Sequence, residues 1–266
     1  MQILIPSRGR GPTKQFTYRA LPKTVRDKYR TTVVIPDEDD GKYDWVDIPI
    51  HVLPRGCDGI CAARNEIIKL CEDSTVLMLD DDLVAWSAKV GMGPYHKASD
   101  AELEHGFSEV ERLLTEFGHG SIGYRFHADT VDTVRYNYRP QRAIGYNLDV
   151  LRKHHLMFSL PLMEDFEMAL SLMKLGYASF HYYGIIQDQP SSNAAGGCSI
   201  FRTADLQKSV SLALHARFPE AVTLVTKVVA GGWEGMKERT DVRVQWAKWA
   251  KHNGAGPISH QVKSIT

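Results

Sequence analysis

The chain has 266 residues, enough to bury a substantial core, and we predict one main domain with an extension at its end. Its 32 basic and 32 acidic residues cancel, which excludes a global field that attracts polyanions, so any contact with nucleic acid must come from a local patch. Apolar residues make up 43% of the sequence, as in a globular protein, and no apolar run approaches the roughly 20 residues that span a bilayer.

Neither a signal peptide nor a zinc site is indicated. Met1 to Pro6 has the pattern of a short strand that leads into a basic loop. The cysteines include one close pair, without the second pair that would complete a tetrahedral zinc site. They are Cys57, Cys61, Cys71 and Cys198. We therefore expect free thiols in a reducing compartment, and a soluble, cytoplasmic protein with no membrane partner.

Short apolar runs alternate with helical patterns in the first half of the chain. Strands are predicted at residues 2–5, 31–35, 50–53 and 76–79. Helices are predicted at residues 60–71 and 101–117, where apolar residues recur every three or four positions. This alternation favours an α/β fold with a mostly parallel central sheet and helices on both faces.

The second half is less regular. Strands are expected at residues 121–127, 130–138, 143–148 and 178–186. Helices are expected near residues 151–155 and at 166–175, the latter ending at Gly176. A loop is expected from 187 to 197, and a basic, aromatic and helical tail from 233 to 253.

Three consecutive aspartates, Asp80, Asp81 and Asp82, end the buried strand predicted at 76–79. Ligands bind open α/β sheets at the carboxyl ends of strands, and three adjacent like charges require a cation or solvent. Alternation along an extended chain points Asp80 and Asp82 to one side, where two carboxylates suit Mg²⁺ or Mn²⁺ and a substrate phosphate. The alternative is a solvated turn, because aspartate favours turns.

Other charged loops follow the neighbouring strands. Pro6, Ser7, Arg8 and Arg10 follow the first strand, and Asp37 follows the second. Because parallel strands end at the same edge, these residues are expected to share a cleft with the aspartates. Arginines suit a diphosphate, and Asp37 could accept a hydrogen bond from a base or ribose. A solvated basic loop is the alternative for Arg8 and Arg10.

An ordered set of motifs resembles a GT-A glycosyltransferase over about residues 1 to 190. The nucleotide-sugar half of that superfamily is similar to Ile5-Pro6-Ser7-Arg8-Gly9-Arg10, Ala62-Ala63-Arg64-Asn65-Glu66 and Leu79-Asp80-Asp81-Asp82. The acceptor half is similar to Gly145-Tyr146-Asn147, Glu164-Asp165 and Gly176-Tyr177.

The resemblance implies a nucleoside-diphosphate sugar donor, a UDP-sugar above all, and Mn²⁺ or Mg²⁺. Asp80 and Asp82 match the outer positions of the family's D-x-D motif, so Asp82 would bind the metal and Asp80 the metal or the donor ribose. Asp81 would support the donor site from the turn. Arg64 matches the basic helix position that braces the aspartates or the diphosphate.

The same resemblance gives Asp165, with Glu164 beside it, the role of general base on the acceptor hydroxyl in inverting members. Favourable placement of both acids at the start of a helix is the alternative. The family often adds a third metal ligand after its last core strand, for which this chain offers His181 or Asp188. Residues 191–197 would form either a mobile lid or a plain loop.

The acceptor is expected to contact Tyr146 and Asn147 and a patch that interleaves basic and aromatic residues. The patch includes Arg139, Arg142 and, in the tail, Trp233. Such interleaving is typical of a nucleic-acid groove, whereas the tail by itself favours an amphipathic helix that packs on the sheet. The chain resembles bacteriophage enzymes that glycosylate 5-hydroxymethylpyrimidines, which implies DNA as the acceptor, 5-hydroxymethylcytosine or 5-hydroxymethyluracil as its base, and the host cytoplasm as the location.

We predict a glycosyltransferase domain at 1–230, with a nucleotide-sugar half at 1–100 and an acceptor half at 101–230, followed by an extension at 231–266. Two rival functions stay open. The loop from Ser7 to Thr13 and Pro22-Lys23 faintly resemble the Gly-rich loop and the later Pro-Lys of sugar-nucleotidyltransferases, although the loop lacks their consecutive glycines. A catalytically inactive module that only binds DNA or a partner would tolerate Asp82→Asn and Asp165→Asn.

Overall fold

We describe the protein from a computed structural model, over residues 1–12, 16–57, 59–91, 93–125, 132–188, 202–228 and 237–259. The first half contains β1 Gln2–Pro6, α1 Thr17–Ala20, α2 Lys23–Lys28, β2 Thr32–Ile35, the 3-10 helix η1 Asp37–Asp39, β3 Ile50–Val52, α3 Gly59–Leu70, β4 Thr75–Leu79, β5 Ala85–Ala88, β6 His96–Lys97 and α4 Asp100–Glu116. The second half contains β7 His119–Tyr124, β8 Val134–Tyr136, β9 Ala143–Asn147, α5 Leu148–Lys153, α6 Glu164–Lys174, β10 Ser179–Asp188, α7 Ala204–Arg217, β11 Val222–Val228, β12 Glu238–Val244 and α8 Trp246–His252.

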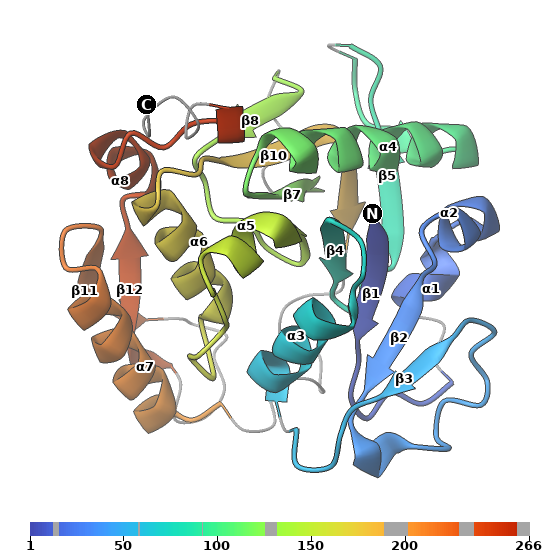
Figure 1. Cartoon of the computed structure of the whole chain (residues 1–266), viewed down its shortest axis with the longest axis horizontal. Helices are drawn as coiled ribbons and strands as arrows, with labels where there is room; N and C mark the ends of the chain where they lie inside the picture. Colours follow the sequence, from blue (N-terminus) through green and yellow to red (C-terminus); the bar gives the residue numbers. More distant parts are fainter. Residues whose placement is uncertain are drawn as a thin grey trace.

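One mixed sheet forms the centre of the molecule, in the order β3-β2-β1-β4-β9-β7-β10-β5-β6, with β8 paired to β10 (Figure 1). The strands β3, β2, β1 and β4 are parallel to one another. Strand β9 runs antiparallel to both of its neighbours, β4 and β7. The start of β9 therefore lies beside the end of β4, and the Asp80 amide donates to the Arg142 carbonyl at 2.7 Å. The pairing of β4 with β9 brings the second half of the chain to the edge of the sheet where β1, β2 and β4 end.

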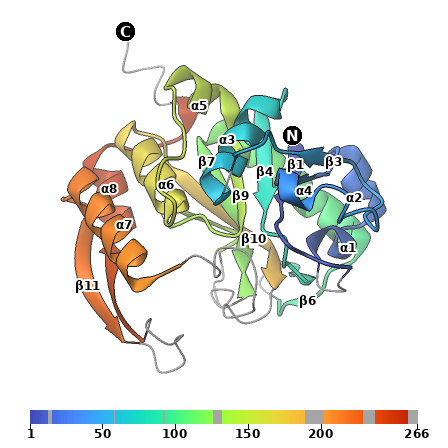
Figure 2. The same ribbon diagram turned by 90° about the horizontal axis from the view of Figure 1, so that it is seen from below.

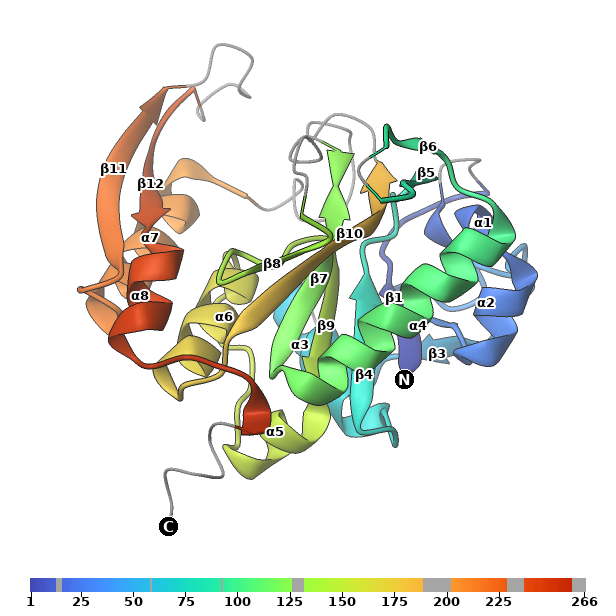
Figure 3. The ribbon, with the colours of Figure 1, turned by 90° about the horizontal axis from the view of Figure 1, so that it is seen from above.

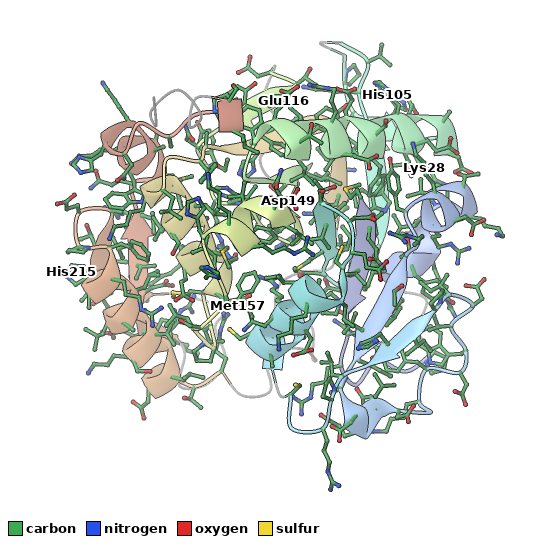
Figure 4. All side chains as sticks on the ribbon, in the orientation of Figure 1. Lys28, His105, Glu116, Asp149, Met157 and His215 are labelled. Atoms are coloured by element: carbon green, nitrogen blue, oxygen red, sulfur yellow. The ribbon has the colours of Figure 1, made fainter. Side chains whose placement is uncertain are left out.

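Apolar clusters cover both faces of the sheet. One face packs against α1, α2 and α4, through residues that include Tyr18, Val25 and Phe107. The opposite face packs against α3, α5 and α6. Helix α4 begins at a capping box between Ser99 and Glu102 and turns its polar side to solvent, where Figure 4 labels His105 and Glu116. The α/β fold with helices on both faces is thus confirmed.

The C-terminal residues form a smaller unit beside α6 (Figures 2 and 3). Strands β11 and β12 pair as an antiparallel ribbon, and α7 and α8 join it to α6 through a third apolar cluster that includes Leu170, Leu214 and Trp249. The tail was predicted to be helical throughout, which is wrong for Glu238–Val244. Alternating side chains pair this strand with β11, and only Trp246–His252 is helical. The expected domain boundary at residue 230 falls between the two strands of the ribbon.

Other boundaries differ from the predictions for local reasons. Strand β5 was not predicted, because its pairing with β10 decides its structure. Helix α5 begins at Leu148, earlier than expected, since Asn147 caps it by accepting a hydrogen bond from the Val150 amide. The strand expected at 130–138 is confined to Val134–Tyr136 within the described residues. No described helix combines the length and apolar character that crossing a bilayer requires.

A fully buried histidine makes the stability of this fold sensitive to acid. His119 is the first residue of β7, which lies between β9 and β10. Burial is the main cause that lowers the pKa of His119 to about 3, and the neighbouring His181 adds to it. Below the ordinary pKa near 6.5 the unfolded chain takes up a proton that the folded chain does not, so stability falls with pH between about 6.5 and 3. We expect a loss of about 2 kcal/mol in unfolding free energy from this group between pH 6.5 and 5.

Denaturant unfolding of the native chain and of His119→Gln at pH 7.5 and 5.0 checks this expectation. At each pH the unfolding free energy of the variant is subtracted from that of the native chain, so that contributions from the other titrating groups cancel. Between pH 7.5 and 5.0 this difference should shift by about 2 kcal/mol in favour of the variant. His105→Gln, an exposed change of the same kind, should leave the difference unchanged. A shift that is equal in the two variants would contradict the assignment to His119.

Candidate active site

Polar contacts hold the loop after β1 against the segment that follows β2. Ser7 Oγ lies 2.8 Å from the hydroxyl of Tyr43, and the same hydroxyl accepts from the Arg10 amide at 3.0 Å. The Gly9 amide donates to the buried carboxylate of Asp39 at 2.5 Å. Gly9 has a φ of 65°, a conformation that side chains other than glycine rarely adopt. The loop therefore has one defined conformation beside the end of β4.

Asp81, the middle aspartate, is occupied by contacts within the protein. Its Oδ2 accepts from Ser7 Oγ at 2.7 Å and from Arg10 Nε at 3.0 Å, and its Oδ1 accepts from Arg10 Nη2 at 2.9 Å. This fork is the bidentate geometry in which a guanidinium binds a carboxylate most strongly. Thr17 ties the same turn to α1, since its amide donates to the Asp81 carbonyl at 3.0 Å. Asp81 thus joins the two loops and is not available as an open ligand.

The outer aspartates keep part of their surface open. Burial raises the pKa of Asp80 to about 7, with Arg64 opposing the rise and Asp82 and Asp81 adding to it. The pKa of Asp82 is also raised, by burial and by Asp81, against Arg10 and Arg142. The Asp80 side chain is still 38% exposed. The nearest cations are Arg64 Nη2, 4.0 Å from Asp80, and Arg10 Nη2, 3.6 Å from Asp82, so neutralisation by protein groups is incomplete.

These two carboxylates fit a divalent cation. Carboxylates whose pKa is raised by burial and by neighbouring carboxylates gain most from an added positive charge, and hard oxygen ligands are those that Mg²⁺ and Mn²⁺ prefer. Within the described residues no group of three or more histidine, cysteine, aspartate or glutamate side chains is arranged as a metal site. A cation here would therefore take its remaining ligands from water and from a bound phosphate.

Arg64 connects the aspartates to the start of α6. Its Nη1 lies 2.9 Å from Glu164, and its guanidinium lies 5.5 Å from the ring centre of Phe158. Burial alone would lower the pKa of Arg64, but Glu164, Tyr146 and Asp80 raise it overall, so it stays charged. Burial raises the pKa of Glu164 in turn, against the effect of Arg64. This buried pair fixes the first turn of α6 beside the end of β4.

Asp165, next in the same turn, pairs with a different arginine. Arg139 donates from Nε and Nη2 to Asp165 Oδ2, at 2.9 and 2.7 Å, while Asp165 Oδ1 accepts from the Phe166 amide at 3.0 Å. The guanidinium carbon lies 4.0 Å from the ring centre of Phe166. Met163, which precedes the helix, has a left-handed φ of 57° and turns the chain so that both acids enter the first turn. The structure thus brings Asp80, Arg64, Glu164 and Asp165 into one neighbourhood.

Three other predicted donor residues take no part in the loop contacts described above. Arg8 pairs with Glu38 at 2.5 Å on the outer side of the loop, and Asp37 begins the 3-10 helix without contacting the loop in the interactions described above. Pro6 ends β1. Asp39 and Tyr43, which also follow β2, are the residues that contact this loop. The hydrogen bond expected between Asp37 and a base or ribose stays a prediction. The acidic cluster after β2 indicated a functional loop, but nothing in its pattern distinguished Asp39 from its neighbours.

The two candidates for a third metal ligand are far from equivalent. His181 lies in the middle of β10 and is buried, with its Nδ1 3.0 Å from Ser121 Oγ. Asp188 ends β10, and its carbonyl accepts from the Val84 amide at 2.9 Å, so its backbone lies next to the turn of Asp82. Its carboxylate accepts from Arg125 at 2.7 Å. Position alone therefore favours Asp188, while its carboxylate is engaged by an arginine.

The predicted acceptor residues separate into different surroundings. Tyr146 and Asn147 are buried, and Asn147 uses its side chain to cap α5 and to donate to the Leu114 carbonyl. Arg142 lies over the ring of Tyr124, 4.5 Å from its centre, on the side of Asp80 and Asp82. Of this set, Arg139 alone contacts Asp165 in the interactions described above. Trp233 and the proposed lid at 191–197 lie outside the described residues.

The fork between Arg10 and Asp81 gives a direct test of the loop's role. We expect Asp81→Asn to raise the KM for a phosphate-bearing donor by about tenfold, because loss of one charged hydrogen bond frees the loop. Steady-state kinetics against donor concentration measure this effect. Asp47→Asn removes an exposed partner of Arg26 and should leave KM unchanged. An unchanged KM in the Asp81 variant would show that the fork does not shape the donor site.

Comparison with known proteins supports the same fold. Residues 1–197 match the family described as TET-Associated Glycosyltransferase. No curated protein sequence gave a match.

Solved structures resemble the chain at low sequence identity, which concerns the fold alone. A glucosyl-3-phosphoglycerate synthase from Mycobacterium tuberculosis, in complex with Mn²⁺, UDP and phosphoglyceric acid, has a TM-score of 0.54 and 11% identity, covering 91% of this chain and 86% of its own. A mannosyltransferase from Pyrobaculum calidifontis, with GDP-Man and Mn²⁺, has a TM-score of 0.50 and 13% identity, covering 72% and 57%. S. aureus TarS 1-349 has a TM-score of 0.46 and 13% identity, covering 80% and 65%. The chain thus spans less than two thirds of the length of the last two.

Proposed function

The chain belongs to the TET-associated glycosyltransferase family, and from this premise we propose that it transfers a sugar from a nucleoside-diphosphate sugar to a hydroxyl of DNA. The favoured acceptor is 5-hydroxymethylcytosine, with 5-hydroxymethyluracil as the second choice. The observation that carries the proposal is that Arg64 lies between the carboxylates at the end of β4 and the acids at the start of α6. A partly open pair of carboxylates lies on one side of it, and the acids at the start of α6 lie on the other.

On the donor side, Arg10 and the loop from Ser7 would meet the diphosphate, and Asp80 and Asp82 would hold Mn²⁺ or Mg²⁺. When bound, that cation neutralises charge on the leaving diphosphate. Two solved structures of the same fold contain UDP or GDP-Man together with Mn²⁺, which supports a nucleotide-sugar donor, and we propose a UDP-sugar. Asp81 keeps the loop in place.

On the acceptor side, Asp165 would take the proton of the hydroxyl. The hydroxyl oxygen forms a bond to the anomeric carbon of the sugar, the bond from that carbon to the diphosphate oxygen breaks, and the nucleoside diphosphate leaves with the electron pair. A sugar hydroxyl or hydroxymethyl group is a poor nucleophile, so a positioned carboxylate contributes substantially to the rate. Glu164 stays paired with Arg64 and orients the turn.

A DNA acceptor requires the modified base to leave the duplex or to be presented in a single strand. The family name associates the chain with TET enzymes, and this supports a hydroxymethylated base as the substrate. Bacteriophage origin and action in the host cytoplasm are part of the same proposal.

Mass spectrometry of DNA tests the proposal. Oligonucleotides with 5-hydroxymethylcytosine, 5-hydroxymethyluracil or unmodified pyrimidines are incubated with Mn²⁺ and a panel of nucleotide sugars. We expect one sugar to add to a hydroxymethylated strand and none to the unmodified strand. Absence of transfer to any strand would contradict the DNA acceptor, and release of pyrophosphate from a nucleoside triphosphate and a sugar phosphate would favour a nucleotidyltransferase instead.

A further inference from the structure

The pairing of Arg139 with Asp165 occupies one oxygen of the carboxylate that the acceptor hydroxyl has to reach. Both contacting nitrogens of Arg139 donate to the same oxygen, Oδ2. A carboxylate oxygen accepts about two hydrogen bonds, so Oδ2 is fully occupied, whereas Oδ1 accepts from the Phe166 amide and keeps one acceptor position. A hydroxyl can donate to Oδ2 only after Arg139 has moved.

The neighbouring arginine provides a contrast. Arg64 holds Glu164 with only 6% of its side chain exposed, whereas Arg139 holds Asp165 with 38% of its side chain exposed. The guanidinium of this pair is open to solvent although the Asp165 side chain is only 9% exposed, so a partner arriving from solvent can reach Arg139. A buried pair such as that of Arg64 and Glu164 does not exchange in this way.

The segment that carries Arg139 lies between two residues in the left-handed conformation. Asn137 has a φ of 62° and Arg142 a φ of 66°, which is uncommon for residues other than glycine. Such conformations cluster at binding and switching segments. Tyr138, next to Arg139, is exposed, so a large ligand has access to this segment.

A strand phosphate offers two non-bridging oxygens that accept from a guanidinium in the same bidentate geometry as a carboxylate, so a phosphate placed beside Arg139 competes with Asp165 for it. A hydroxymethyl group in a nucleic-acid strand is flanked by phosphates, whereas water and a free nucleoside bring none. We infer that Arg139 is a specificity residue, which releases Oδ2 of Asp165 only for an acceptor that carries a phosphate beside its hydroxyl. This inference rests on the proposed function and identifies the acceptor class as a phosphodiester strand.

The test compares three acceptors with equal hydroxymethyl groups. They are a 5-hydroxymethylcytosine oligonucleotide, the same oligonucleotide with neutral methylphosphonates on both sides of the modified base, and the free 5-hydroxymethyl nucleoside. We expect the native chain to favour the charged strand over the neutral one by at least about tenfold in kcat, the effect of one charged hydrogen bond. We expect Arg139→Gln to bring the ratio close to one, and to speed hydrolysis of the donor when DNA is absent. Arg139→Lys should restore part of the ratio.

Arg112→Gln is the matched control, because Arg112 forms exposed ion pairs within α4, and its ratio should equal that of the native chain. Equal rates on charged and neutral strands by the native chain would overturn the inference and leave the DNA acceptor intact. A full ratio in Arg139→Gln would overturn it as well. Failure of the native chain to modify any strand would overturn both this inference and the proposed function. If Arg139→Gln does not fold, the acceptor series with the native chain still decides.

Discussion

Asp165→Asn is expected to lower kcat for sugar transfer by roughly 10²–10⁴-fold, the contribution of a positioned general base. Asparagine keeps the size of the side chain and an oxygen that can accept from Arg139, so the start of α6 should survive. Asp165 is separated from the donor loop by Arg64 and Glu164, so the dissociation constant of the nucleotide sugar should not change.

Single-turnover kinetics and donor titration by calorimetry measure the two quantities separately. Asp149→Asn, at an exposed aspartate in the first turn of α5, is the matched control and should behave as the native chain. Full transfer activity in the Asp165 variant would remove this residue as the base. Absence of sugar transfer by the native chain itself would instead favour a catalytically inactive binding module.

Asp82→Asn, in contrast to Asp165→Asn, should weaken donor binding and abolish the part of it that depends on the metal. The change removes one of two carboxylates whose raised pKa reflects burial and a shortage of positive charge. Metal stabilisation of a leaving diphosphate contributes several kcal/mol, so kcat/KM should fall by about 10²–10³-fold. The native chain should lose the same activity when EDTA removes Mn²⁺.

Titration of the donor with and without Mn²⁺ measures this effect in both chains. Addition of Mn²⁺ should tighten binding to the native chain and leave binding to the variant unchanged. Asp73→Asn tests for a general effect of lost negative charge, because Asp73 pairs with Arg30 and the N-terminus away from this turn. An Asp82 variant that still responds to Mn²⁺ would place the cation elsewhere.

The parallel half of the fold was predictable because its strands are apolar on both faces. Residues from Val76 to Leu79 are buried throughout β4, and an unbroken apolar run of this length is typical of the interior of a parallel sheet. The aspartates that follow such a strand must lie at its carboxyl edge. Position along the chain was therefore sufficient to place these loops at one edge of the sheet.

Pairing between distant segments was not predictable in the same way. The basic and aromatic tail was consistent with a helix, and its first part became a strand because β11 offered a partner. Asp81 was assigned to the turn, but its fork with Arg10 depends on how two loops 71 residues apart meet. The pairing of Arg139 with Asp165 likewise depends on tertiary structure, since periodicity and motif spacing carry no information about it.

The fork between Asp81 and Arg10 also bears on how tightly a donor can bind. Chain segments that become ordered only on contact with a ligand lose conformational entropy at that moment, and affinity is reduced accordingly. Here Ser7, Gly9 and Arg10 are already restrained by Asp81, Tyr43 and Asp39. The entropy of this loop is lost during folding instead. Donor association should therefore show only a small unfavourable ordering contribution, in contrast to enzymes whose phosphate loops order on binding.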